Sequence, residues 1–223
     1  MSEDHADHPI TPWPAPAGSP VLLFGGSFDP PHAAHVRLAL DAQRSRAAGT
    51  WLVVIPAARS PHKDAGPAVS TADRLAMLRL AFAGYPNVAI WTDEFDRAAS
   101  GAPSYFVETL ERASQIAADA ELSFAIGTDQ AASLHRWERP RRILELAAPV
   151  ILPRKPITDR ESLRQRLCEI GFWTDDERER LINALAETPI IEISSTDIRA
   201  GDDRHLPAEV ADYIARHRLY RSG

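Results

Sequence analysis

Short runs of apolar residues recur along the chain and alternate with segments of mixed polarity. Each run is four to six residues long, which suits strands buried on both faces of a parallel sheet. Between the runs, apolar residues return every three or four positions, as in the helix that Ser70 would begin and Gly84 would end. This alternation predicts an α/β fold, a doubly wound parallel sheet with helices on both faces. The predicted strands are 21–24, 51–56, 88–91, 122–126 and 148–153.

The first 20 residues lack this pattern. They contain five prolines and two histidines and have no apolar segment that could serve as a secretion signal. We therefore predict a disordered or extended tail over residues 1–20, in which Trp13 could dock on the folded body. Residues 21–223 have the length of a single domain.

Composition and charge narrow the function classes. The net charge of -6 argues against a broad basic surface for DNA or RNA. No apolar run approaches the roughly 20 residues that a membrane span needs. The single cysteine, Cys168, excludes an internal disulfide and is consistent with a reducing compartment. We expect a cytoplasmic protein that binds neither nucleic acid nor membrane.

The strand at 21–24 runs directly into a loop with the sequence GGSFDPPHAAH, residues 25–35. An alanine- and leucine-rich helical segment follows. Two adjacent glycines predict backbone angles closed to other residues and room for a ligand to approach the main chain. The helix start behind them favours an anion, most naturally a phosphate.

His32 and His35 are three positions apart, so both imidazoles are expected above the start of that helix. There they could donate to bound phosphates. A capping or surface histidine is the ordinary alternative, and the pair could also form half of a zinc site. Because Cys168 lies far along the chain with no ligand cluster beside it, we favour phosphate.

A second candidate anion site lies at residues 191–199, which are predicted to run from a strand into a helix. Consecutive hydroxyl groups of Ser194, Ser195 and Thr196 would lie at the helix start. Arg199 follows one turn later. A well-capped short helix is the alternative. The chain has neither a G-x-G-x-x-G nor a P-loop motif, so neither a usual dinucleotide cofactor nor a P-loop NTPase is indicated.

These motifs resemble a known family. Residues 25–35 resemble the G-G-[ST]-F-D-P-x-H-x-G-H signature of the nucleotidyltransferase superfamily, with Ala34 in place of a glycine. Residues 193–199 resemble its I-S-[SA]-T-x-[IL]-R motif. Three further segments, 60–63, 104–110 and the Leu-Tyr pair at 219–220, resemble elements of the bacterial nicotinate-nucleotide adenylyltransferases. The resemblance spans most of residues 21–221.

The resemblance implies a Rossmann-like sheet of the nucleotidyltransferase type over residues 21–223. It also implies transfer of the adenylyl group of ATP to nicotinate mononucleotide, with Mg²⁺ accompanying ATP and no dedicated protein ligands for the metal. The implied catalytic residues are His32, His35 and Arg199. The implied ATP contacts are Gly25, Gly26, Ser27, Phe28, Lys63, Gly127, Asp129, Arg154, Ser194, Ser195 and Thr196. The implied substrate contacts are Tyr105, Phe106, which stands where the family has threonine, and Trp137.

Taken without the resemblance, several of these residues have ordinary explanations. A glycine followed by Asp129 after a strand is common turn chemistry. Tyr105 and Phe106 could be core aromatics, with Ser104 as the N-cap of their helix. Trp137 could pack under a loop instead of stacking on the pyridine ring of a substrate.

Other functions stay open at this point. Within the same class, the acceptor could be nicotinamide mononucleotide, pantetheine phosphate or, with CTP, glycerol phosphate. A non-catalytic RNA-binding relative is a second alternative, and a metal sensor is a third. The sensor would use His5, His8, His32 and His35. The chain could also form a homo-oligomer, a property that the sequence leaves open.

Overall fold

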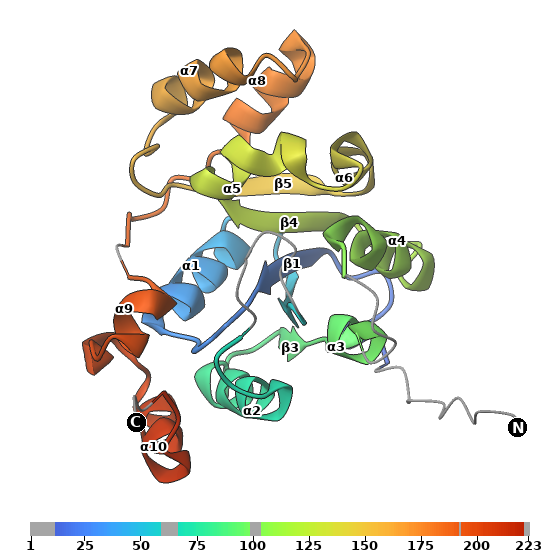
Figure 1. The fold of residues 1–223 in the computed structure, drawn as a ribbon. Helices are drawn as coiled ribbons and strands as arrows, with labels where there is room; N and C mark the ends of the chain where they lie inside the picture. The colour runs from blue at the N-terminus through green and yellow to red at the C-terminus, as the bar shows by residue number, and fades with distance from the viewer. Residues whose placement is uncertain (1–11, 59–66, 99–103, 192, 221–223) are drawn as a thin grey trace, which may run out of the picture.

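One parallel sheet organises the molecule, in a computed structural model that describes residues 12–58, 67–98, 104–191 and 193–220 (Figure 1). The strand order is β3-β2-β1-β4-β5, and every neighbouring pair is parallel. All five predicted strands are confirmed to within two residues at each end. The strands are β1 (Val21–Gly26), β2 (Trp51–Pro56), β3 (Val88–Ile90), β4 (Leu122–Gly127) and β5 (Ala148–Leu152).

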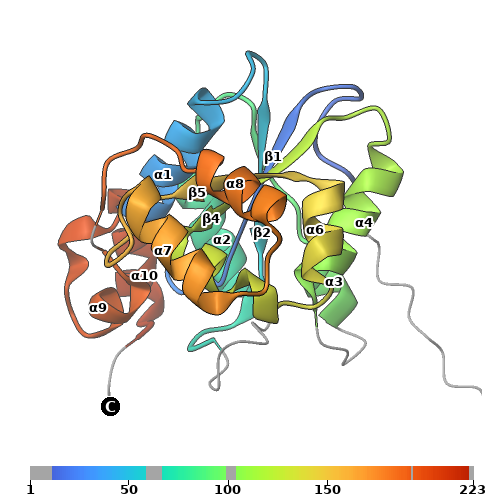
Figure 2. The same cartoon turned by 90° about the horizontal axis from the view of Figure 1, so that it is seen from above.

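Helices connect the strands and cover both faces of the sheet, which confirms the predicted α/β doubly wound class (Figure 2). The chain builds outward from β1 in one direction to β3 and then in the other direction to β5. The helices are α1 (Ala33–Arg44), α2 (Thr71–Ala81), α3 (Asp93–Ala98), α4 (Phe106–Ile116), α5 (Thr128–Ser133), α6 (Pro140–Leu146), α7 (Arg160–Ile170), α8 (Asp175–Asn183), α9 (Ser195–Arg199) and α10 (Ala208–His217).

Alternate residues of the central strand serve two separate cores. In β1, Leu23 packs with Leu110 of α4 and its neighbours, whereas Leu22 packs with Leu78 of α2 and Val210 of α10. All five side chains are fully buried. Burial on both faces explains why the strand is a continuous apolar run instead of an alternating one.

The helix starts follow the predicted capping only in part. Ser70 begins α2 as expected, because its hydroxyl accepts the N–H of Asp73 at 3.1 Å. The helix ends at Ala81, before Gly84, which has a φ of 79° in the turn that follows. The prediction for Ser104 is wrong: α4 begins at Phe106, one residue later than that cap requires.

The predicted strand before the second anion motif is also wrong. Ile191 and Ile193 lie in no strand, and the edge of β5 pairs only through an isolated bridge between Ile151 and Leu185. Instead of adding to the sheet, the chain leaves the β5 edge and crosses to the side of α1, where α9 lies (Figure 1). This crossing carries the second motif to the first.

Part of the segment predicted as a tail is packed. The Trp13 ring lies edge-on to that of buried Trp91, with ring centroids 5.0 Å apart, and Ala15 is buried in the same core. The predicted docking of Trp13 is therefore confirmed. Residues 1–11 lie outside the described part of the chain, so the predicted tail and the single domain over residues 21–223 stay predictions.

Candidate active site

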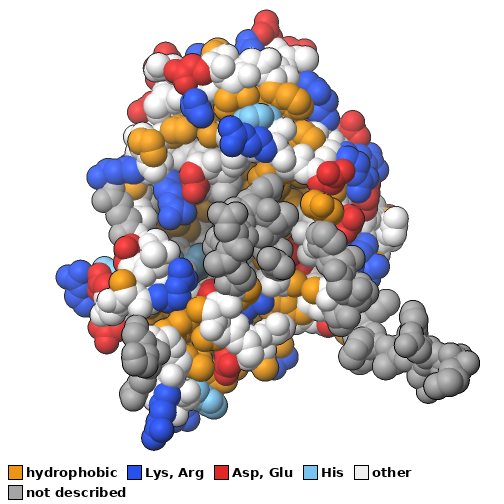
Figure 3. Space-filling view, in the orientation of Figure 1, with side chains coloured by type: hydrophobic (Ala, Val, Ile, Leu, Met, Phe, Trp, Pro, Cys, Tyr) orange, Lys and Arg blue, Asp and Glu red, His pale blue; other side chains and the backbone are white. Residues whose placement is uncertain are grey.

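A cavity of about 490 Å³ opens at the carboxyl ends of β1 and β4. Between these two strands the strand order reverses, because the chain builds the sheet from β1 to β3 on one side and from β4 to β5 on the other. Ligands of open α/β sheets bind at this position, and the volume suits a nucleotide-sized ligand. In the space-filling view, Lys and Arg side chains lie above and below a hollow between α9 and the β5 edge (Figure 3).

The cavity gathers nearly all of the implied site. Every described residue of that set lines it except Phe28. His35 and Arg199, which are far apart in the sequence, therefore share one cleft. Lys63 lies outside the described residues, so its contact stays a prediction.

The two glycines at the end of β1 do not have the backbone angles that were predicted for them. Neither Gly25 nor Gly26 has a positive φ, so the expectation of special backbone angles is wrong. A Cβ at Gly26 would lie 2.8 Å from the Phe28 ring, so a side chain of this protein makes the close approach, and the expected approach of a ligand stays a prediction. The positive φ in this loop belongs to Phe28 itself, at 47°.

Phe28 supports the site from behind. Its side chain is 1% exposed, and its ring packs edge-on against those of Phe24 and His35, with centroid distances of 5.7 and 5.0 Å. Phe28 packs against an imidazole and is not among the residues that line the cavity, and its implied contact with ATP stays a prediction.

The two histidines form a reciprocal cap at the start of α1. The backbone N–H of His35 donates to Nδ1 of His32 at 3.4 Å, and that of His32 donates to Nδ1 of His35 at 3.3 Å. Their rings stack with centroids 3.7 Å apart, so both imidazoles lie together over the helix start, as predicted. Because Nδ1 accepts in each ring, the proton of the neutral form lies on Nε2. In each neutral ring, Nε2 is therefore the atom that carries the N–H donor.

Burial controls the charge of His32. Its side chain is almost enclosed, and this burial, together with the nearby charge of Arg154, lowers the pKa of His32 to about 4. Asp197 opposes the shift only weakly. His32 is therefore neutral at pH 7 before a ligand arrives, and it can donate from Nε2 without bringing a full charge into the core.

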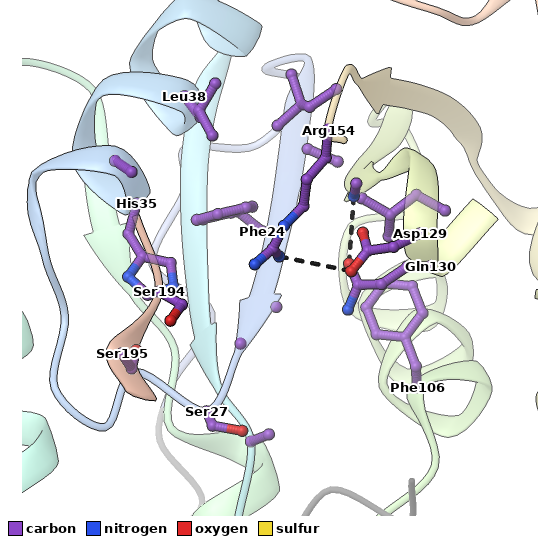
Figure 4. Close-up of a pocket in the computed structure, with 18 of the residues that line it drawn as sticks. Phe24, Ser27, His35, Leu38, Phe106, Asp129, Gln130, Arg154, Ser194 and Ser195 are labelled. Atoms are coloured by element: carbon purple, nitrogen blue, oxygen red, sulfur yellow. Dashed lines mark hydrogen bonds and ion pairs between the residues drawn. The ribbon is translucent and has the colours of Figure 1, made fainter. Parts of the chain in front are cut away.

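The second motif docks on the first loop. Ser194 caps α9, and the Ser195 hydroxyl donates to the Pro30 carbonyl at 3.0 Å. One turn later, Nη1 of Arg199 donates to the Asp29 carbonyl at 2.5 Å. The predicted anion cradles at 25–35 and 194–199 are thus adjacent parts of one wall; His35, Ser194 and Ser195 lie together in Figure 4.

The opposite wall comes from the ends of β4 and β5. Arg154 extends across the cavity, and its Nη1 lies 3.5 Å from a carboxylate oxygen of Asp129 (Figure 4). The side chain of Gln130 accepts the N–H of Gly127 at 3.2 Å. A Cβ at Gly127 would displace the Asp129 carboxylate from its present position beside Arg154. Sequence reasoning missed Gln130, since a glutamine in a helix has no distinctive pattern.

Aromatic side chains close one end of the cavity. The Phe106 ring lies edge-on to Trp137 with centroids 5.8 Å apart, and its other neighbour is Phe124 at 5.7 Å. Tyr105 occupies the N-cap position of α4 but makes no capping hydrogen bond with its side chain. The helix therefore presents backbone N–H groups beside the two rings, as a carboxylate would need.

A buried acid at this end was not anticipated from the sequence. Glu94 is 6% exposed, lines the cavity, and accepts the Thr109 hydroxyl at 3.0 Å. Arg97 in turn donates to Thr109 at 2.6 Å. Burial raises the pKa of Glu94 to about 7, although Thr109 and Arg97 favour the ionised form. In the sequence, Glu94 is one acid in an acidic stretch, and only the fold singles it out.

Comparison with known proteins agrees with this geometry. Residues 23–201 match the model of the cytidylyltransferase-like family, and the chain belongs to that family. A probable nicotinate-nucleotide adenylyltransferase of Laribacter hongkongensis (strain HLHK9) is 40% identical over 217 residues, covering 91% of this chain and 94% of the relative. A probable nicotinate-nucleotide adenylyltransferase of Pseudomonas paraeruginosa (strain DSM 24068 / PA7) is 36% identical over 220 residues, covering 92% of this chain and 99% of the relative.

The fold is also found among solved structures. The nicotinic acid mononucleotide adenylyltransferase of Plasmodium falciparum, complexed with NaAD, superposes with a TM-score of 0.63 at 15% identity. The match covers 91% of this chain and 97% of that one. At this identity the likeness concerns the fold, and it confirms the predicted nucleotidyltransferase-type sheet.

Proposed function

We propose that this protein is a nicotinate-nucleotide adenylyltransferase. It transfers the adenylyl group of ATP to nicotinate mononucleotide and forms nicotinate adenine dinucleotide and pyrophosphate, a step of NAD biosynthesis. The observation that carries the proposal is a single cavity that joins two anion cradles to an aromatic end. The family membership and the names of the relatives support the same conclusion.

The cradles suit a triphosphate held along its length. His32 and His35 donate from Nε2 to oxygens of the α-phosphate and its bridge. Arg199 and the hydroxyl groups at the start of α9 hold the β- and γ-phosphates, which leave as pyrophosphate. These groups are in place before the reaction, so charge that develops on the leaving group meets donors already oriented toward it.

The acceptor needs little activation. A phosphate monoester is already a nucleophile near neutral pH, so its oxygen can attack the α-phosphorus in line without a general base. The protein contributes mainly by positioning the two substrates and by stabilising charge.

The aromatic end suits the pyridine ring of the acceptor. Trp137 offers a flat face to a planar aromatic cation, and Phe106 holds the indole at its edge. The N–H groups at the start of α4 meet the carboxylate of the ring. Because Phe106 stands where the resembling family has threonine, these backbone donors carry that contact alone.

We also propose that Mg²⁺ enters with ATP. No group of three potential ligands among histidine, cysteine, aspartate and glutamate converges within the described ranges. Asp129 is the cavity carboxylate beside Arg154 and can contribute at most part of a coordination shell. This donor set fits a metal that keeps several waters and is held mainly by phosphate oxygens. When bound, Mg²⁺ neutralises phosphate charge.

Release of pyrophosphate tests the function directly. The purified protein is incubated with ATP and Mg²⁺ and, in parallel, with nicotinate mononucleotide, nicotinamide mononucleotide or pantetheine phosphate. We expect the highest kcat/KM with nicotinate mononucleotide. Faster turnover of another acceptor would overturn the substrate assignment, and no release with any acceptor would overturn the activity.

The remaining predictions concern the setting of the enzyme. No helix within the described part of the chain is long and apolar enough to cross a membrane. Cytoplasmic location, absence of nucleic-acid binding and a homo-oligomeric state stay predictions. Retention of RNA on a filter and light scattering would test the last two.

A further inference from the structure

The chain after α10 returns to the loop that carries the histidines. α10 packs on α2, and the backbone then turns through Arg218 and Tyr220, which have φ values of 55° and 59°. This turn brings the Tyr220 hydroxyl to Asp29, where it donates to Oδ1 at 2.7 Å. The two residues are 191 positions apart in the sequence.

Asp29 connects three segments of the chain. It is 6% exposed, and its second carboxylate oxygen accepts the N–H of Ala68 at 2.7 Å. Its own carbonyl accepts Nη1 of Arg199 at 2.5 Å, and the same nitrogen lies 4.0 Å from Oδ2. The Tyr220 contact, the segment at Ala68 and α9 therefore all meet at one buried residue.

Arg199 lines the cavity, whereas Asp29 and Tyr220 lie behind that wall. The carboxylate of Asp29 is thus close enough to compete with a bound phosphate for the guanidinium. Its two oxygens accept hydrogen bonds from Tyr220 and Ala68, while Arg199 donates to the carbonyl and its Nη1 stays 4.0 Å from Oδ2. Burial and the hydrogen bond to Asp29 raise the pKa of Tyr220 well above its usual range, so the phenol remains a donor at any working pH.

We propose that Tyr220 is a positioning residue for the pyrophosphate end of the site. By occupying Asp29, it keeps the Arg199 guanidinium available to the β- and γ-phosphates. Without the hydroxyl, the buried carboxylate has an unsatisfied oxygen, and Arg199, whose Nη1 already lies 4.0 Å from Oδ2, can move closer and pair with it. The proposal rests on the proposed function in one respect, the assignment of Arg199 to the leaving pyrophosphate.

Tyr220→Phe is the direct test, because it removes only the hydroxyl. Tyr213→Phe is the matched control: Tyr213 lies in α10, and its hydroxyl donates to Asp73 at 3.0 Å, away from the cavity. For Tyr220→Phe we expect pyrophosphate affinity, measured by calorimetry, and kcat/KM for ATP to fall roughly three- to tenfold, the scale of one hydrogen bond. The KM for nicotinate mononucleotide and every parameter of the control should stay at the wild-type value.

A second variant separates competition from loss of packing. In Tyr220→Phe combined with Asp29→Asn, the group beside Arg199 no longer carries a charge that can capture the guanidinium, so pyrophosphate affinity should recover toward wild type. Unchanged affinity in Tyr220→Phe, or a further fall in the double variant, would overturn the proposal. Pyrophosphate binding needs no turnover, so the result stands even if the acceptor is not nicotinate mononucleotide.

Discussion

Replacing the buried acid at the aromatic end should change how the stability of the protein depends on pH. Burial raises the pKa of Glu94 from its ordinary 4.5 to about 7, so the folded state binds this proton more tightly than the unfolded chain. The protonated carboxyl therefore contributes to stability. This contribution is fully present below pH 4.5 and is lost as the pH rises through 7. Since each pKa unit corresponds to about 1.4 kcal/mol, the loss amounts to about 3 kcal/mol.

Glu94→Gln removes the ionisation and keeps the shape of the side chain and an acceptor for Thr109. The free energy of unfolding is measured with urea at pH 5 and pH 8.5, followed by tryptophan fluorescence. We expect the free energy of unfolding of the variant, relative to that of wild type, to increase by up to about 3 kcal/mol from pH 5 to pH 8.5. Glu108→Gln, at a half-buried partner of Arg97, is the control and should show a small change in unfolding free energy at both pH values.

Parallel pH curves for wild type and Glu94→Gln would refute this reasoning. They would mean that the carboxyl is hydrated in the folded protein or that Thr109 and Arg97 fully compensate its burial. A variant that is more stable than wild type at pH 5 but not at pH 8.5 would refute the expected direction of the pKa shift of Glu94. Calorimetric unfolding at the same pH values offers an independent check, because a stability difference of this size shifts the Tm by several degrees.

Three further outcomes follow from the site. His35→Ala should lower kcat by roughly two orders of magnitude, the scale of one lost transition-state donor, with circular dichroism unchanged; near-normal turnover would remove its central role. His32 should stay neutral down to about pH 4, checked by the NMR titration of its ring, and a midpoint near 6.5 would contradict its burial. Trp137→Ala should raise the KM for nicotinate mononucleotide more than that for ATP, and equal increases would argue against ring stacking.

Local patterns predicted the sheet well, because four of the five strands are largely buried and therefore appear as apolar runs, whereas the edge strand β3 is half-buried. The start of α2 was predictable for a similar reason, since the Ser70 cap involves residues within one helical turn. Predictions failed where a local pattern was compatible with more than one backbone structure. Ile191 and Ile193 fit a strand, but β5 has only an isolated bridge on that side and the chain leaves the sheet.

The glycines show a related limit. Their presence at the end of β1 indicated a special position, but the reason was decided by a neighbour, since a Cβ at Gly26 would meet the Phe28 ring. Phe28 itself belongs to the signature, and the sequence could not show that it faces His35 instead of a ligand. Motifs identify which residues matter, whereas packing determines what each of them touches.

The sequence by itself determined the five strands of the sheet, the two candidate anion-binding motifs and the resemblance to the family, because these depend on residues close together in the chain. Only the tertiary structure brought Arg199 beside Asp29, placed Tyr220 behind both, and enclosed Glu94 with Thr109. These contacts join segments that lie far apart in the sequence. They depend on how the helices pack on the sheet, and no local sequence pattern predicts that packing.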